Sequence, residues 1–238
     1  MITIKRKALI LSYSQIWFAN EISILNIWKI ITYKQSFYSK KRFGFIKKEF
    51  ATVEIDLTQS VDQIFMNFSN TIKNEIRRAQ QEHIMIKINN DLELFQSFFN
   101  EFAINKGINP ITFEKLKSHE NKYLLTFALS EQAIISAHYY LVDKQSSRVR
   151  LLYSASARFS DSNNRNFIGR ANKLLHFEDM KYFKEIGMEI MDFGGITIPA
   201  KTKEQIGINS FKESFGGIRK FYSEYNSLLY NIFSKFHN

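Results

Sequence analysis

A lysine between two phenylalanines is a candidate catalytic residue in this sequence. Lys212 stands in the segment Phe211–Gly217, which reads FKESFGG, and another glycine pair closes the segment Met191–Gly195, which reads MDFGG. An ammonium group held in such a place could stabilise negative charge as it develops on a carbonyl oxygen. A lysine beside a turn is also an ordinary surface residue, so the pattern leaves both interpretations open.

Two further side chains, His138 and Glu178, are candidates for a catalytic base. His138 lies within the strand-like segment Ser136–Tyr140, where a histidine facing a cleft could accept a proton from an amine. Glu178 falls within the apolar arc of the helix expected over Ala171–Ile186, and an inward carboxylate is either paired or functional. The alternatives are a hydrogen-bonded strand histidine and a salt bridge from Glu178 to a lysine or arginine.

Metal chemistry is not expected from this sequence. The chain has no cysteine, which excludes thiolate nucleophiles, disulfides and cysteine-based metal sites. The remaining histidines show no ligand spacing: His83, His119, His176 and His237. We therefore expect no metal and no covalent intermediate on a cysteine.

A short segment before the Ala171–Ile186 helix is the candidate for binding phosphate. Its spacing, Asn-x-x-Gly-x-Ala, is close to that of an acyl-CoA pyrophosphate loop, which usually starts with Gln or Arg. Small residues let backbone N–H groups approach phosphate oxygens, and a helix N-terminus favours anions. We expect a polar loop that binds acyl-CoA, or acetyl-CoA, as co-substrate; the alternative is an ordinary helix start. The segment is Asn166, Phe167, Ile168, Gly169, Arg170 and Ala171.

Helix and strand patterns alternate along the elements that must position these residues. Strands are expected at 7–13 (with a possible extension at 16–18), 52–57, 84–88 and, as an antiparallel meander, 124–129, 133–142 and 148–154. Helices are expected from the capping box Ser60-x-x-Gln63 to about 83, then at 91–106, 113–119, 171–186 and 202–208. Residues 22–31 fit helix or strand, 33–48 read as a loop, and 218–233 as two strands or a strand and a helix. The pattern predicts an α+β fold with a central, mostly antiparallel sheet flanked by helices.

Positive charge is concentrated at the start of the chain. The net charge is +10, and the first 50 residues hold ten Lys/Arg against two acids. Such a segment can attract RNA, an anionic lipid surface or a nucleotide-linked substrate, or it can be a solvated surface. We expect residues 1–50 to be a basic segment packed on a core formed by 51–238. With no apolar run of about 18 residues and no signal-peptide pattern, we expect a cytoplasmic protein that could touch the inner face of the membrane.

Several segments, taken in order, resemble the Fem-type transferases. The block Asn70–His83, followed by the strand expected at Ile84–Ile88, is similar to their R-x-x-I-R-x-A helix. Leu174–Glu178, Met191–Gly195 and Phe211–Gly216 extend the resemblance, which covers about Thr52 to Tyr225. Fem-type enzymes and related single-domain acyltransferases belong to the GNAT (Gcn5-related N-acetyltransferase) superfamily.

The resemblance implies a GNAT-like fold for residues 51–238 and transfer of an acyl or aminoacyl group to an amine. A Phe-Lys pair lies at the transfer site of Fem-type enzymes, which assigns Phe211 and Lys212 to that place. Asp192 would end a strand beside the cleft, and we group it with Phe211 and Arg78 as substrate-binding candidates. Fem-type enzymes usually have two such domains, whereas this chain has room for one.

Three functional hypotheses follow. The first is transfer from acyl-CoA to an amine of a small molecule or glycan, such as an amino sugar of a nucleotide-linked or surface-glycan precursor. The second is a Fem-type aminoacyltransferase that uses aminoacyl-tRNA, gripped by the basic first 50 residues, and acts on a peptidoglycan-type precursor. The third is a non-catalytic GNAT-fold binding module that attaches to a partner or anionic membrane through the same basic segment.

Overall fold

The computed structural model describes residues 1–8, 11–159 and 164–235, and these residues form two compact units. The terminal unit contains residues 1–52, 195–199 and 219–238, so it joins both ends of the chain. The central unit contains residues 53–194 and 200–218. Within the described residues no helix is long and apolar enough to cross a bilayer.

The central unit is built on strands that follow the order β4-β9-β8-β7-β6-β5. The pairs β5–β6, β6–β7 and β7–β8 are antiparallel, and the pair β8–β9 is parallel. The predicted meander is confirmed as β6, β7 and β8. The strands are β4 (Phe45–Asp56), β5 (Met85–Asn89), β6 (Tyr123–Ser130), β7 (Ala133–Asp143), β8 (Arg148–Ser156) and β9 (Ile190–Ile196).

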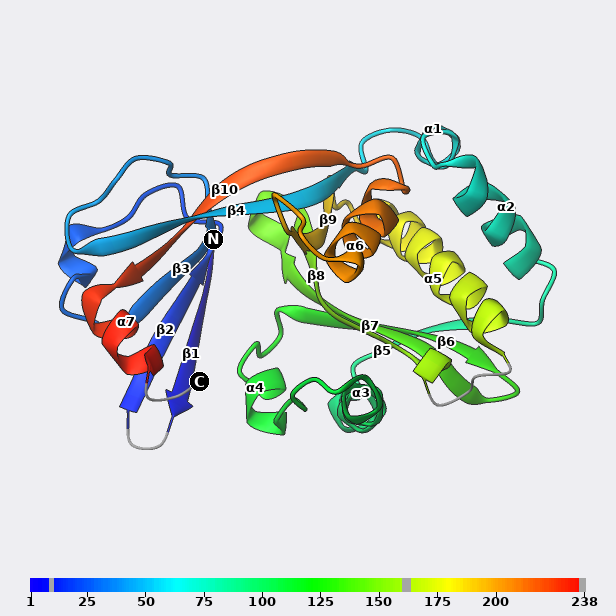
Figure 1. The fold of residues 1–238 in the computed structure, drawn as a ribbon, viewed down its shortest axis with the longest axis horizontal. Helices are drawn as coiled ribbons and strands as arrows, with labels where there is room; N and C mark the ends of the chain where they lie inside the picture. Colours follow the sequence, from blue (N-terminus) through cyan, green and yellow to red (C-terminus); the bar gives the residue numbers. More distant parts are fainter. Residues whose placement is uncertain (9–10, 160–163, 236–238) are drawn as a thin grey trace. The chain divides into compact units, whose positions relative to one another are not determined.

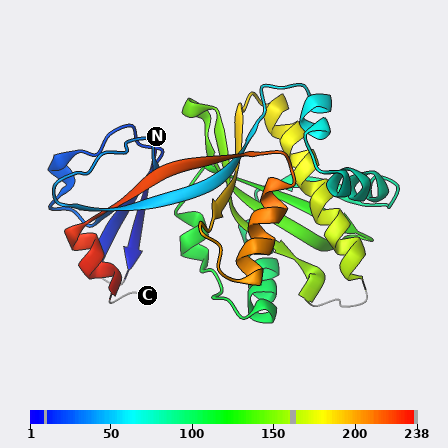
Figure 2. The same cartoon turned by 45° about the horizontal axis from the view of Figure 1, so that its top comes forward.

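Helices cover both faces of the sheet in the central unit. Helices α5 and α6 lie on one face and α3 and α4 on the other (Figures 1 and 2). This arrangement, with a mixed and mostly antiparallel sheet, confirms the α+β prediction. The helices of this unit are α1 (Val61–Met66), α2 (Asn70–Ala79), α3 (Leu92–Lys106), α4 (Phe113–Lys117), α5 (Arg165–Glu185) and α6 (Lys203–Glu213), with 3₁₀ turns η2 (Lys144–Ser146) and η3 (Ala157–Phe159).

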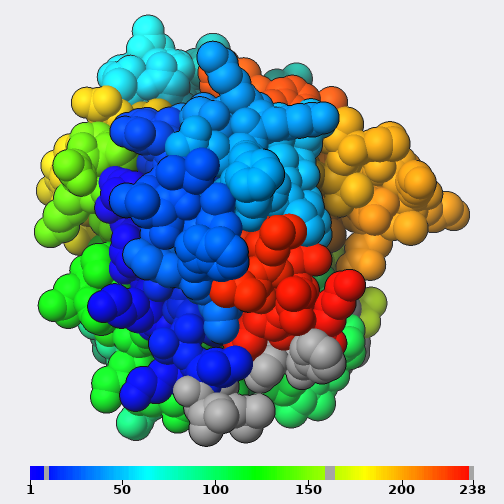
Figure 3. All heavy atoms as spheres, turned by 90° about the vertical axis from the view of Figure 1, so that its left-hand side faces the viewer, coloured from blue at the N-terminus to red at the C-terminus, as the bar shows by residue number. Residues whose placement is uncertain are grey.

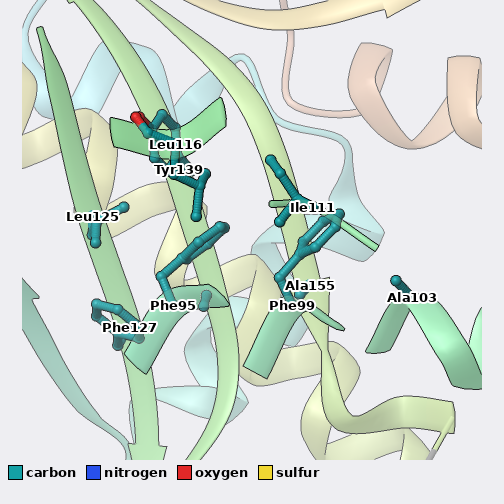
Figure 4. Packing of buried hydrophobic residues seen from close by; sticks show 10 residues of the cluster. Phe95, Phe99, Ala103, Ile111, Leu116, Leu125, Phe127, Tyr139 and Ala155 are labelled. Carbon is teal, nitrogen blue, oxygen red and sulfur yellow. The ribbon is translucent and has the colours of Figure 1, made fainter. Parts of the chain in front are cut away.

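Alternation along the strands decides which side chains face which layer. Phe127 and Tyr139 point toward α3, where they pack with the fully buried Phe95 and with Phe99 (Figure 4). The intervening residues of the same strands, such as Ala128, point toward α5. Burial of large apolar side chains on both faces stabilises the sheet by about 2 kcal/mol for each one, so the sheet is a rigid support for the helices above it.

The terminal unit pairs strands from the two ends of the chain. Its strand order is β1-β2-β3-β10-β4, with β2 parallel to β3 and β3 antiparallel to β10. Tyr33 and Tyr225, from β3 and β10, are buried together in its core. The elements are β1 (Ile2–Ala8), β2 (Leu11–Trp17), η1 (Ile24–Asn26), β3 (Ile31–Ser36), the first part of β4, β10 (Ile218–Ser227) and α7 (Leu228–Lys235).

Three predicted elements are wrong. The strand expected at 7–13 spans a chain reversal, because β1 pairs antiparallel with β2 from Ile2↔Trp17 to Ala8↔Leu11; residues 9–10 lie outside the described part. The loop expected at 33–48 contains β3 and the start of β4, whose polar residues pair across strands, as Lys34 does with Glu224 at 2.9 Å. The single helix expected over 61–83 is divided, because the Ser69 hydroxyl accepts the Ile72 N–H and starts a second helix.

Candidate functional site

Helix α5 begins earlier than expected and changes the meaning of the segment Asn166–Ala171. Its first turn starts at Arg165, and the Ile168 N–H already donates to the Asn164 carbonyl at 2.9 Å. Only the N–H groups of the first turn are left without a partner inside the helix. The predicted loop is therefore wrong: these residues form the first two turns of α5, and Gly169 and Ala171 are buried in it. Their binding of acyl-CoA stays a prediction.

A pocket of about 450 Å³ opens in the central unit beside this helix. Six elements contribute to it, so its shape depends on the packing of segments that lie far apart in the sequence. Its lining comes from α3 (Phe102, Lys106), β8 (Leu151, Ser154, Ala155, Ser156), η3 (Arg158), α5 (Arg165, Asn172, His176), β9 (Phe193) and α6 (Ile208, Phe211, Lys212).

The lining is strongly cationic. It includes Lys106, Arg158, Arg165 and Lys212, and none of its described residues is a carboxylate. Lys106 lies 3.6 Å from Glu204, whose side chain is largely exposed, so that pair is a weak one. Walls of one charge sign focus the electrostatic potential in a concave site. The pocket is therefore suited to a ligand that carries phosphate or carboxylate groups.

Lys212 is the most buried of these cations. It lies in the last turn of α6. A Cβ built on Gly194 would stand 3.7 Å from the Lys212 Nζ and 3.9 Å from an Arg150 guanidinium nitrogen, so both cations lie beside this glycine. Burial, and then the Arg150 cation, lower the pKa of Lys212 from 10.5 to about 8, with Asp192 opposing the change. A lysine in this state is mostly charged at neutral pH and has few water molecules to screen it.

Asp192 lies beneath the pocket and does not line it. Its Oδ1 accepts the Gly194 N–H at 2.6 Å and its Oδ2 accepts an N–H of Arg150 at 3.2 Å. Gly194 has a φ of 81°, a conformation that suits glycine, so the carboxylate holds the strand end in this turn. The contacts indicate a supporting position for Asp192, and its expected contact with substrate stays untested.

Behind α5 a buried polar network fixes one residue of the pocket wall. The Asn172 Oδ1 accepts from the Ser136 hydroxyl at 2.6 Å and lies 3.1 Å from His138 Nε2. His138 Nδ1 lies 2.7 Å from the Asp179 carboxylate, to which the Tyr140 hydroxyl also donates at 2.7 Å. Asn172 also lines the pocket, and because its oxygen is engaged by Ser136 and His138, the NH₂ group is the part of this amide left to donate to a ligand.

His176 connects the network to the cavity. Its ring stacks on that of His138 at 4.1 Å and also contacts Phe193 and Phe211. Burial, and then the neighbouring His138 and Lys212, hold the pKa of His176 well below 6.5. It is therefore neutral at physiological pH and can accept or donate a hydrogen bond, but it is a weak base.

The same network contains three side chains whose donor atoms lie within 4.8 Å of one another: His138, His176 and Asp179. Such a set could hold a metal ion, although the stacked imidazole rings and the nearby Lys212 are unfavourable for one. The expectation of no metal stays a prediction.

Two of the expected site residues line the pocket, and the others do not; among the others, Asp192 and the segment Asn166–Ala171 have been described above. Phe211 and Lys212 lie in its wall, whereas His138 lies behind it. Arg78 is exposed on α2 and is not part of the lining. Glu178 was expected on the inward face of α5, and this is wrong: it forms a partly exposed salt bridge with Lys181 at 2.7 Å.

Sequence reasoning missed most of the pocket. Arg165, Asn172 and His176 share one face of α5 at spacings of seven and four residues, a pattern that becomes visible only when the helix starts at 165. Lys106 and Arg158 had no local signal, because each reaches the pocket from a different element.

Comparisons with known proteins identify the fold. No protein-family model matches the sequence, and no curated protein matches it. The solved structure of FemX is similar at a TM-score of 0.68 and 14% identity, covering 98% of this chain and 85% of FemX. The C-terminal domain of a putative lysylphosphatidylglycerol synthetase from Agrobacterium fabrum is similar at a TM-score of 0.56 and 9% identity, covering 88% of this chain and 71% of that one. L-PGS from Bacillus licheniformis is similar at a TM-score of 0.55 and 10% identity, covering 87% of this chain and 71% of L-PGS.

The chain therefore has a GNAT/FemAB-like fold, which confirms the resemblance inferred from the motifs. The fold by itself does not determine a substrate.

Proposed function

We propose that this chain is an N-acyltransferase that moves an acyl group from a phosphate-bearing donor, acyl-CoA first of all, to an amine. The observation that carries the proposal is the pocket of about 450 Å³ with four cations in its wall, one of them the half-buried Lys212. A cavity of this size holds a small acyl group and an acceptor, with the rest of the donor outside.

Phosphate binding is assigned to the guanidinium groups at the start of α5. Arg165 lies in the first helical turn, where the helix dipole adds to its charge, and Arg158 lies in the η3 turn that precedes the helix. Planar guanidinium groups match phosphate oxygens better than ammonium groups do. These two arginines would bind the donor's phosphates while the acyl group enters toward Lys212.

The reaction proceeds by direct attack of the amine on the thioester carbonyl. A C–N bond forms, the C–S bond breaks, and the proton lost by the amine ends on the departing thiol. Negative charge on the carbonyl oxygen is stabilised by the Lys212 ammonium and the Asn172 NH₂ group. The Lys212 ammonium, which is not assigned to phosphate, lowers the pKa of an amine bound beside it and so favours the neutral nucleophile.

Acetyl-CoA binding measured by calorimetry tests the donor. Arg165→Ala should weaken it about tenfold or more, since a charge-assisted hydrogen bond is lost, and Lys117→Ala, which removes an exposed cation outside the pocket, should not. Thiol release with a panel of amino sugars then tests the acceptor. Absence of acetyl-CoA binding would exclude this donor.

A second donor, aminoacyl-tRNA, is favoured by two observations. The basic first 50 residues carry ten Lys/Arg against two acids, and the fold is similar to FemX over 98% of the chain. Salt-sensitive binding of tRNA without any acetyl-CoA signal would favour this donor. Absence of both signals would leave the fold without an enzymatic role, as expected for a binding module.

A further inference from the structure

Two neighbouring loops of the terminal unit expose large apolar side chains in a strongly basic surrounding. The loops cover residues 23–30 and 37–45, and Figure 3 shows this part of the chain, in the middle and lighter blues, at the surface. The exposed apolar residues are Ile24 (47%), Leu25 (79%), Trp28 (84%) and Phe43 (83%). We call these four residues, with the basic residues around them, the loop patch.

The loop patch is held in place by the fold. Successive tight turns close the first loop, where Asn26 donates to the Tyr33 hydroxyl at 2.6 Å, and the Tyr33 ring packs edge-on against Phe45 after the second loop. Gly44 lies so close to Ile27 that a Cβ would stand 2.6 Å from its side chain. The two loops therefore support each other, and the outward position of Trp28 and Phe43 is a property of the folded chain.

The two loops and the residues between them carry positive charge, with Glu21 and Glu49 just outside this segment. Between residues 22 and 48 there are seven basic residues and no acidic one: Lys29, Lys34, Lys40, Lys41, Arg42, Lys47 and Lys48. Lys34 is paired with Glu224, whereas Lys29, Lys40, Lys41 and Lys48 are exposed. Tryptophan and phenylalanine enter the interface between lipid headgroups and acyl chains, and lysines beside them bind anionic headgroups.

We propose that the loop patch binds the surface of an anionic lipid bilayer. RNA is a weaker match, because the aliphatic side chains of Ile24 and Leu25 offer nothing to phosphates or bases but insert readily into acyl chains. Each basic residue near such a surface strengthens binding about fivefold, and an inserted aromatic ring contributes about tenfold or more.

Sedimentation of the full chain with lipid vesicles tests the proposal. We expect binding to vesicles in which about one lipid in three is phosphatidylglycerol, and little binding to phosphatidylcholine alone. The double variant Lys40→Glu/Lys41→Glu should weaken binding at least about 25-fold, and Trp28→Ser and Phe43→Ser about tenfold each. Lys220→Glu and Phe221→Ser, at exposed positions of β10 in the same unit, are matched controls that should bind as the native chain does.

Tryptophan fluorescence gives an independent readout. The chain has two tryptophans, Trp17, which is buried, and Trp28, which is exposed, so a blue shift of emission on adding anionic vesicles should come from Trp28 and disappear in Trp28→Phe. The proposal is wrong if the shift persists in that variant or if the control variants lose as much binding as the patch variants. It is also wrong if the charge-reversed variant loses binding to bulk tRNA while its vesicle binding is unchanged.

Discussion

Replacing Lys212 by methionine is expected to stabilise the protein and to remove most of its turnover. Burial and the nearby Arg150 lower the pKa of Lys212 from 10.5 to about 8. A tenfold change in proton affinity corresponds to about 1.4 kcal/mol, so keeping this ammonium charged costs the folded state about 3 kcal/mol at neutral pH. Methionine has a similar length and no charge, so Lys212→Met should raise the free energy of unfolding by up to about 3 kcal/mol.

The pH dependence of this effect has a definite sign. In the unfolded chain Lys212 keeps its proton up to about 10.5, whereas in the folded chain it loses the proton near 8. Between these values the unfolded state binds more protons, so the free energy of unfolding increases with pH. In urea denaturation, the free energy of unfolding of the native chain should rise across this range relative to that of Lys212→Met. The two values should become equal only above pH 10.5.

Turnover should change in the opposite direction. Loss of a group that stabilises the oxyanion typically costs about 10²- to 10³-fold in kcat. Lys212→Arg keeps a charge that does not titrate below pH 12, so the turnover of the native chain relative to this variant should fall as pH rises through about 8. If Lys212→Met turns over within a few-fold of the native chain, or unfolds more easily at pH 7, the assignment of Lys212 as a poorly solvated, functional cation is wrong.

Three other predictions concern single side chains. Asn172→Ala should lower kcat about 100-fold in steady-state assays because the oxyanion loses a donor; an unchanged kcat would leave Asn172 a structural residue. Glu178→Gln should leave kcat unchanged and should alter the free energy of unfolding by no more than about 0.5 kcal/mol, since its partner Lys181 is exposed. A large fall in kcat would restore Glu178 as a base candidate. Gly216→Ala should cost about 2 kcal/mol or more in urea denaturation, because φ is 74° and a Cβ would stand 2.5 Å from the Asn67 carbonyl oxygen. The control Gly107→Ala, at φ 73° with nothing within 4 Å, should cost about 1 kcal/mol, and equal losses would show that the Asn67 contact is unimportant.

Much of the fold was predictable because its signals are local. The capping box of Ser60 and Gln63 starts α1 as expected, and α3 occupies the helix expected at 91–106, with Asp91 and Gly107 capping its two ends. Alternating side chains and short connections identified the meander β6–β8. In each case the deciding contacts are made within a few residues of the chain, and the residue types are sufficient to reveal them.

Elements that depend on distant partners were missed. Strand β3 is polar enough to resemble a loop, and it becomes a strand because β10, about 190 residues later, pairs with it. On α5, a shift of one position along the helix moves a side chain from solvent to the core, because successive side chains point about 100° apart. Glu178 therefore meets Lys181 on the partly exposed side, whereas Asp179 is buried beside His138.

The sequence by itself determined the α+β class, the meander, several of the helices and the basic start of the chain. The family resemblance predicted a site at Phe211 and Lys212, both of which line the pocket. Only the tertiary structure decided that Lys106, Arg158 and Arg165 meet Lys212 around one pocket, with Asn172 and His176 in its wall. The physical reason is that a site is made by convergence. Helix packing and strand register bring together side chains from distant segments, and no local pattern encodes the distance between them.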